Sequence, residues 1–353
     1  ATAGNTGLGL ALIAALKGYK IILVIPDKMS REKILHLEGL GAEIILTRSD
    51  VPEGHPEYYQ DLARKIAAET PGSFLADQFS NPANPLAHRT TTAPEIWEQM
   101  KGNVDAVVAG VGSGGTLTGL AQFFKSKNPD ISMVAADPEG SVVADAILTG
   151  KYKYEGGSWL VEGVGEDFIP NNFDLSLMDD AEIVSDKEAF EVLQVLLKEE
   201  GILGGSSSGT LVAAAAKWCR KQTEPKNVVT FICDTGNKYL SKAFNKSWLH
   251  DNNLLESEKF GDLRDLISRR ADQGEMITVA PSDSLLVAYN RMRASDISQL
   301  PVIKEGDLLG IIDEEDVLIS VSKNQGTFSD EVERHMIQQL DVLQYNASED
   351  ELI

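Results

Sequence analysis

The feature that most constrains the fold is a repeated change of hydrophobic pattern between residues 8 and 249. Continuous apolar runs have the length of strands buried on both faces, and they fall at residues 21–25, 42–46, 104–109, 132–136 and 228–232. Stretches with helical spacing lie between or beside these runs, at residues 8–16, 30–39, 117–125, 187–200 and 207–220. Strands separated by helices predict an α/β fold with a mostly parallel sheet flanked by helices.

Composition excludes several classes of protein. The chain has 54 acidic and 32 basic residues, a formal net charge of −22, so we expect neither nucleic acid nor a membrane surface as a partner. No apolar run approaches the length of about 20 residues that spans a bilayer. The two cysteines, Cys219 and Cys233, predict neither a disulfide framework nor a metal site, and they favour a reducing, cytoplasmic location.

The pattern divides the chain of 353 residues into two domains. Residues 1–250 form the first, the polar segment 251–259 is a linker, and residues 260–353 form a small α+β module. In this module we expect a strand, a helix, a hairpin and a helix, at residues 276–279, 282–293, 300–312 and 313–321. Residues 343–353 are similar to residues 277–286, so we expect a complete first repeat and a second repeat that begins but is cut off.

Three glycine-rich loops have the same design, a run of small residues leading into a helix. They are residues 2–7 (TAGNTG), 112–116 (GSGGT) and 204–209 (GGSSSG). Glycine lets the backbone approach a ligand, and the unpaired N–H groups at a helix N-terminus attract an anion. Open α/β sheets bind ligands at the carboxyl ends of their strands, so these loops predict a site for an anionic small molecule.

The second loop alone leaves two ligands open. Residues 110–115 (GVGSGG) match the dinucleotide pattern G-x-G-x-x-G, and Asp137 ends the following strand. An NAD-dependent oxidoreductase is therefore one hypothesis. The loop lacks the GK[ST] ending of nucleoside-triphosphate sites, so that ligand class is not expected.

Longer strings carry a resemblance to a known family. They are residues 77–79 (DQF), 84–88 (NPLAH), 137–141 (DPEGS), 161–170 (VEGVGEDFIP) and 234–239 (DTGNKY). With the three loops, they resemble the fold-type II pyridoxal-phosphate (PLP) enzymes, and among these the cystathionine β-synthases. The tail from Phe260 onward resembles the regulatory module of that family, which usually occurs as a tandem pair. Cysteine synthases share the loops but generally lack the tail and the DPEGS string.

The resemblance implies two groups of site residues. The loop at residues 112–116 would hold the PLP phosphate, Ser206 would face the pyridine nitrogen and Asn5 the 3′-oxygen. The cofactor-binding residues implied are Asn5, Gly112, Ser113, Gly114, Gly115, Thr116 and Ser206. The substrate-binding residues implied are Thr2, Ala3, Gly4, Thr6 and Gln78. Ala3 departs from the serine common at its position, and Glu166 replaces a tyrosine seen in some members of the family.

The resemblance also implies a catalytic lysine that this sequence lacks. In the family, a lysine in the string Ser-x-Lys-x-Arg forms the Schiff base upstream of the first loop. No such string occurs here, and Lys17, Lys20 and Lys238 stand in other contexts. We therefore expect that the chain is cut short at both ends, contains no catalytic residue and is inactive alone.

The implied function is a PLP-dependent lyase that replaces the hydroxyl of L-serine with homocysteine to give cystathionine, a step of transsulfuration and cysteine biosynthesis. Three alternatives remain: a cysteine synthase using O-acetylserine and sulfide, the NAD-dependent oxidoreductase, and a non-catalytic adenosyl-nucleotide sensor. The implied partners are small amino acids and further copies of the chain, in a homodimer or larger homo-oligomer. In the module, Asp313 and Asp316 lie where related domains contact the ribose of an adenosyl effector.

Overall fold

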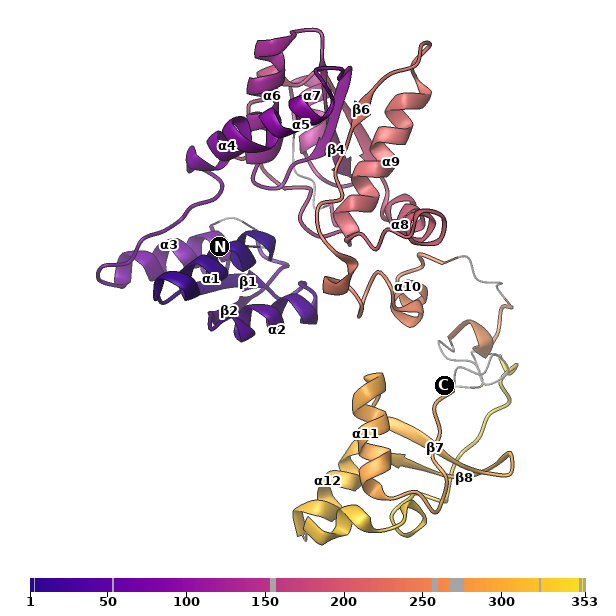
Figure 1. Cartoon of the computed structure of the whole chain (residues 1–353). Coiled ribbons are helices and arrows are strands. Elements are labelled where there is room, and N and C mark those ends of the chain that lie inside the picture. The colour runs from indigo at the N-terminus through magenta and orange to yellow at the C-terminus, as the bar shows by residue number, and fades with distance from the viewer. Residues whose placement is uncertain are drawn as a thin grey trace. The chain divides into compact units, whose positions relative to one another are not determined.

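The computed structural model describes residues 1–2, 4–52, 54–152, 157–255, 260–266, 276–323, 325–348 and 351. They divide into two units, Ala1–Leu255 and Glu256–Ile353, and the boundary lies inside the segment predicted to be a linker (Figure 1). In the described part of the chain, no helix is long and apolar enough to cross a membrane.

A four-stranded parallel sheet organises the larger part of the first unit. Its strands are β3 (Ala106–Gly110), β4 (Ser132–Pro138), β5 (Asp180–Val184) and β6 (Val228–Val229), in the order β5-β4-β3-β6. The predicted α/β class with a mostly parallel sheet is confirmed. Strand β5 was not predicted, because its sequence, DAEIV, begins with a polar and acidic stretch rather than an apolar run.

Helices cover both faces of this sheet (Figure 1). Ala106 and Val108 of β3 belong to a core with two helices of 15 residues each, α8 (Asp186–Glu200) and α9 (Ser206–Arg220). Val107 and Ala109 point the other way, because successive side chains of a strand alternate between faces. They pack with α5 (Ala93–Gln99), α6 (Gly115–Lys127) and α7 (Val143–Thr149). This larger part of the first unit also contains α4 (Ala83–Ala87) and α10 (Lys246–Asp251).

A smaller parallel sheet of two strands, β1 (Ile22–Pro26) and β2 (Glu43–Thr47), begins the first unit. Its helices are α1 (Asn5–Lys17), α2 (Arg31–Gly39) and α3 (Tyr59–Glu69). Leu8, Ile25 and Leu37 share a separate apolar core there. The amide of Thr2 donates to Val24 O at 3.1 Å, which places the first glycine-rich loop beside β1.

The second unit contains the predicted hairpin and helices. Strands β7 (Gln299–Lys304) and β8 (Asp307–Asp313) pair antiparallel, and the helices are α11 (Leu285–Ser295) and α12 (Glu314–Lys323). The predicted strand at residues 276–279 is reduced to one bridge, Val279 to Val302. Part of the predicted second repeat, residues 349–350 and 352–353, lies outside the described residues. Among the described residues, single helical turns also occur at His88–Thr92, Leu175–Leu177, Gly236–Lys238, Leu263–Leu266, Gln325–Ser329 and Val332–Arg334.

Candidate active site

A cavity of about 900 Å³ in the first unit is lined by residues of all three glycine-rich loops. Most of the predicted site residues lie on its wall: Thr2, Gly4, Asn5, Thr6, Gln78, Gly112, Ser113, Gly114 and Thr116. Gly115 and Ser206 do not, and Ala3 lies outside the described residues. The structure thus places residues of all three predicted loops on the wall of one cavity.

The second loop forms a cradle for an anion at the start of the 13-residue helix α6. Gly114 has φ +80°, and an added Cβ would lie 2.9 Å from Phe173 Cα. At Gly112 a Cβ would lie 2.8 Å from Gly163 O, so the loop packs too closely for side chains. No side chain caps α6 and its first turn holds no acidic residue. Its first N–H groups therefore have no side-chain capping partner and no acidic residue in their own turn, which suits an anion site.

Gly115 has a packing role instead of a place on the wall. A Cβ there would overlap the side chain of Asn84. Asn84 Nδ2 donates to Ser113 Oγ at 2.8 Å and to Gln78 O at 2.9 Å. Gly115 therefore admits the amide that joins the second loop to the segment carrying Gln78.

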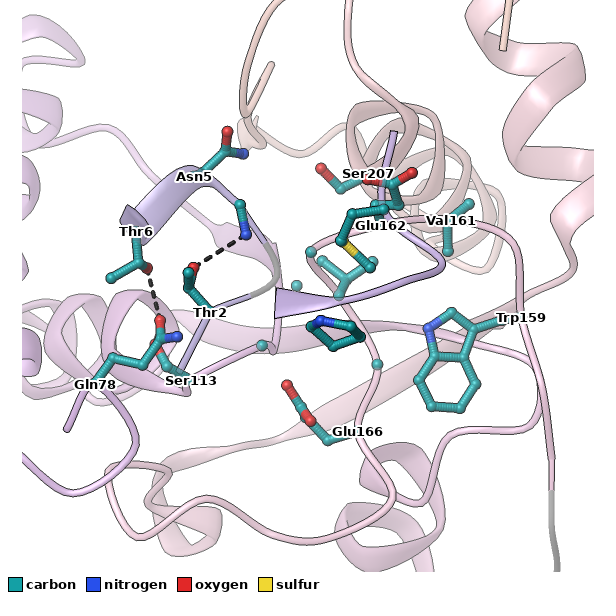
Figure 2. Close-up of a pocket in the computed structure, with 18 of the residues that line it drawn as sticks. Thr2, Asn5, Thr6, Gln78, Ser113, Trp159, Val161, Glu162, Glu166 and Ser207 are labelled. Carbon is teal, nitrogen blue, oxygen red and sulfur yellow. Dashed lines mark hydrogen bonds between the residues drawn. The ribbon is translucent and has the colours of Figure 1, made fainter. Parts of the chain in front are cut away.

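The first loop presents polar groups from the other side of the cavity (Figure 2). Thr2 Oγ1 accepts from the amides of Gly4 and Gly7 at 3.0 and 3.1 Å, so this hydroxyl stabilises the start of α1. Thr6 Oγ1 donates to Gln78 Oε1 at 2.6 Å, and Gln78 Nε2 donates to Ala1 O at 2.9 Å. Thr6 and Gln78 thus form one polar pair, although 72 positions separate them.

At the third loop, the structure places two neighbouring serines differently with respect to the cavity. Ser206 Oγ accepts the amide of Glu162 at 3.0 Å, and the residue is only 2% exposed. Ser207 lines the cavity instead (Figure 2). Both serines begin α9, and successive helical residues are turned by about 100° around the axis. Ser206 therefore faces the backbone behind the wall while its neighbour reaches the cavity.

A buried ion pair, not predicted from the sequence, forms another part of the wall. Lys33 Nζ lies 2.9 Å from Glu162 Oε2, the residues are 1% and 4% exposed, and Nζ lies 4.4 Å from the centre of the Tyr239 ring. Lys242 Nζ is 2.8 Å from Glu162 Oε1. A signal existed: Lys33 shares a buried helix face with Leu37, four residues later.

Comparison with known proteins decides the family. Residues 1–234 match the family described as pyridoxal-phosphate dependent enzyme, and residues 263–323 match the CBS domain. The chain belongs to the pyridoxal-phosphate dependent enzymes.

Individual relatives of this PLP enzyme fall in two groups. The chain is 36% identical over 349 residues to the cystathionine beta-synthase of Dictyostelium discoideum, covering 95% of this chain and 68% of the relative. For the cystathionine beta-synthase of Oryctolagus cuniculus the values are 37% over 336 residues, 94% and 61%. A cysteine synthase of Buchnera aphidicola subsp. Schizaphis graminum (strain Sg) is 41% identical over 257 residues, covering 72% of this chain and 79% of the relative. The chain thus spans about two thirds or less of the two cystathionine beta-synthases.

The cavity has groups that fit PLP. The glycine cradle leading into α6 suits a phosphate, and the Thr116 hydroxyl stands on the same wall. The Ser207 hydroxyl and the Asn5 amide reach the cavity from two other elements. The volume, about 900 Å³, is within the range of small-molecule sites.

A histidine of this PLP enzyme orients the cradle. His88 Nε2 lies 3.1 Å from Thr116 Oγ1, and Nδ1 lies 3.0 Å from Thr92 Oγ1. Burial lowers the pKa of His88, so its ring is neutral near pH 7 and has one donor and one acceptor nitrogen. The ring therefore holds the Thr116 hydroxyl in place.

Glu166 points its carboxyl group toward the cavity (Figure 2). Burial, with the charge of Asp167, raises the pKa of Glu166 well above its usual range, while Lys28 acts in the opposite direction. Lys28 also lines the cavity, with its ammonium 5.1 Å from the centre of the Trp159 ring. A carboxyl group and an ammonium group thus share this part of the wall.

Proposed function

We propose that the protein catalyses a PLP-dependent β-replacement that joins L-serine and homocysteine to give cystathionine. The observation that carries the proposal is the extent of the similarity. Relatives named cystathionine beta-synthase align with 95% and 94% of the chain, whereas the Buchnera cysteine synthase aligns with 72%. An alignment that covers 95% of the chain includes both units.

We assign the cavity residues to PLP as follows. The backbone N–H groups of residues 112–116 and the Thr116 hydroxyl hold the phosphate. The Ser207 hydroxyl faces the ring nitrogen, and Asn5 donates to the 3′-oxygen. A neutral hydroxyl at the ring nitrogen does not hold the ring protonated, which suits loss of a β-substituent more than transamination. When bound, PLP supplies the electron withdrawal that allows the substrate to lose its α-proton and its β-substituent.

The substrate carboxylate belongs beside the first loop in this proposal. Thr6 and Gln78 already form a hydrogen-bonded pair on the cavity wall. Gln78 Nε2 keeps a second N–H for a carboxylate, and the Thr6 hydroxyl can donate to one when it releases Gln78 Oε1. Thr6 and Gln78 come from separate segments of the chain, so a carboxylate bound to both would contact the two segments at once. Thr2 supports the same loop through the amides of Gly4 and Gly7.

The structure argues against the dinucleotide hypothesis. A dinucleotide site needs an acidic side chain after the second strand that reaches the ribose hydroxyls. Asp137 stands at that place but is fully buried, and its Oδ2 accepts the amide of Ala144 at 2.8 Å. Its carboxylate therefore holds the turn before α7 and does not line the cavity.

The test uses the protein as its gene encodes it, supplied with PLP. L-serine with homocysteine should give cystathionine as the dominant product. Chromatography of the amino acids measures its formation. Cysteine formed only from O-acetylserine and sulfide would move the protein to the cysteine synthases, the second candidate, which the 41% identity to the Buchnera enzyme supports. No product from either pair would overturn the proposal.

We further propose that the protein works in the cytoplasm as a homodimer or larger homo-oligomer and that the second unit binds an adenosyl nucleotide. The CBS domain match supports the nucleotide. The Asp316 amide donates to Asp313 Oδ1 at 2.7 Å, so Asp313 caps the start of α12. Equilibrium dialysis with adenosine nucleotides tests the proposed ligand of the second unit. Light scattering tests the proposed oligomeric state.

A further inference from the structure

Asn5 is held by two charged side chains from a distant part of the sequence. Its Nδ2 donates to Asp234 Oδ2 at 2.8 Å, and its Oδ1 accepts from Lys238 Nζ at 2.8 Å. Lys238 Nζ also lies 3.5 Å from Asp234 Oδ2, so the three side chains form a closed set of contacts. Asp234 and Lys238 belong to the segment that resembled the family as DTGNKY.

These contacts determine the orientation of the Asn5 amide. A carboxylate only accepts hydrogen bonds and an ammonium only donates them. If the amide were flipped, its oxygen would face the Asp234 carboxylate and its NH2 group would face the Lys238 ammonium, and neither pair could form a hydrogen bond. Asn5 can therefore occupy one orientation. One of its two N–H bonds is used by Asp234, and its oxygen is used by Lys238. The one donor that remains for a ligand is the second N–H of Nδ2, and the oxygen keeps one lone pair beside the Lys238 ammonium.

Asp234 is itself fixed firmly enough to impose this orientation. Its side chain is 5% exposed, and Tyr239 donates its hydroxyl to Oδ2 at 3.0 Å. The other oxygen, Oδ1, is buried with no hydrogen-bond partner among the described residues. A Cβ on Gly205 would overlap that oxygen, so the carboxylate is packed against the loop that leads to Ser207. Asp234 thus connects the first and third glycine-rich loops.

We propose that Asp234 and Lys238 are positioning residues that hold the Asn5 amide so that it offers the ligand one hydrogen-bond donor. The ligand atom opposite Asn5 is then an acceptor. The inference rests on the proposed function in one respect, because that acceptor is taken to be the 3′-oxygen of PLP. Neither Asp234 nor Lys238 needs to touch PLP.

The experiment is a double-mutant cycle read by PLP binding. The wild type, Lys238→Met, Asn5→Ala and the double variant are titrated with PLP, following quenching of tryptophan fluorescence; Trp159 lines the cavity. Lys238→Met should weaken binding about 10-fold, the size expected for losing a charge-assisted hydrogen bond. Asn5→Ala should weaken it similarly, and adding Lys238→Met to Asn5→Ala should have no further effect.

The absorption spectrum supplies a second readout. A donor at the 3′-oxygen favours its ionised form, so Lys238→Met should lower the ratio of the long-wavelength to the short-wavelength band of bound PLP. The matched control is Lys221→Met, which removes a lysine 2.6 Å from Glu182, outside the cavity wall. This variant should bind PLP as the wild type does.

Three outcomes contradict the proposal. If Lys238→Met changes neither the affinity for PLP nor the absorption spectrum of bound PLP, then Lys238 does not orient Asn5. If Lys238→Met weakens PLP binding as much in the Asn5→Ala variant as in the wild type, the lysine contacts PLP directly. Absence of PLP binding in the wild type would overturn the proposed function itself, and this inference with it.

Discussion

The two serines at the start of α9 show how strongly the role of a side chain depends on direction. Ser206 and Ser207 are chemically identical and adjacent, yet one accepts a backbone amide behind the cavity and the other lines it. The consequences of removing each hydroxyl should therefore differ in kind.

Ser206→Ala should reduce stability and Ser207→Ala should reduce activity. The first change leaves the buried amide of Glu162 without its acceptor, which costs about 1–3 kcal/mol in the free energy of unfolding. The second removes the hydroxyl assigned to the PLP ring, so kcat should fall about 10-fold or more while stability stays near that of the wild type. Urea unfolding and the cystathionine assay separate the two. The assignment of Ser207 fails if Ser206→Ala alone lowers kcat.

Lys33→Met tests the buried ion pair on the cavity wall. The substitution leaves Glu162 buried with only Lys242 as a partner, and breaking such a pair costs about 3 kcal/mol in the free energy of unfolding. Changing Glu162 to Met as well should recover part of the loss, because the unpaired charge is removed. Lys198→Met is the control: its side chain is 83% exposed and its pair with Glu199 spans 3.6 Å, so urea unfolding should be unchanged. Equal effects of the two lysine changes would contradict this account of the pair.

At the scale of elements, the turn from β4 into α7 contains a carboxyl group with an unusual titration. Burial raises the pKa of Asp137 to about 6, even though the amide of Ala144 donates to it. The folded protein then binds this proton more tightly than the unfolded chain does. Unfolding releases the proton between pH 3.8 and about 6, so the contribution of Asp137 to stability falls as pH rises through that window.

Asp137→Asn removes this titration and keeps an oxygen for the Ala144 amide. The stability of the variant relative to the wild type should therefore increase by about 2 kcal/mol between pH 4 and pH 7. The measurement is urea unfolding of both proteins across that range. The change with pH is the test, because a constant cost of the new amide group cancels. A stability difference independent of pH would show that Asp137 titrates in its ordinary range.

How far the sequence predicted the elements depends on how uniform each one is. Four apolar runs correspond to β1, β2, β3 and β4. Strands β1, β3 and β4 are buried along most of their length, as a continuous apolar run predicts, whereas β2 is only partly buried. Strand β5 was missed since Glu182, although 5% exposed, is charged and pairs with Lys221 at 2.6 Å. Such a pair forms only in the tertiary structure, so the local sequence pattern does not predict it.

The same limit applies to the candidate site. Loops were found because glycine is required where backbones approach closely, as at Gly112 and Gly114. The choice between Ser206 and Ser207 needs the rotation of α9 about its axis, which packing sets. Lys33 and Glu162 meet across 129 positions of sequence, so their pairing appears only in the folded chain.

At the scale of the whole molecule, the chain consists of two units with separate cores. The first contains the two sheets and the cavity, and the second has its own apolar cluster, including Leu285, Leu300 and Ile312. Units with independent cores unfold independently unless a large interface couples them. We therefore expect two transitions in differential scanning calorimetry rather than one.

Ligands should shift these transitions selectively. A ligand that binds only the folded form raises stability by about 2.7 kcal/mol when its concentration is 100 times its dissociation constant. PLP should therefore raise the transition of Ala1–Leu255, which contains the cavity, and an adenosine nucleotide should raise the transition of Glu256–Ile353. Lys238→Met should reduce the shift produced by PLP without affecting the shift produced by the nucleotide. A single transition that both ligands move together would contradict the independence of the two units, and coupling between them would then give the second unit a direct means of regulating the first.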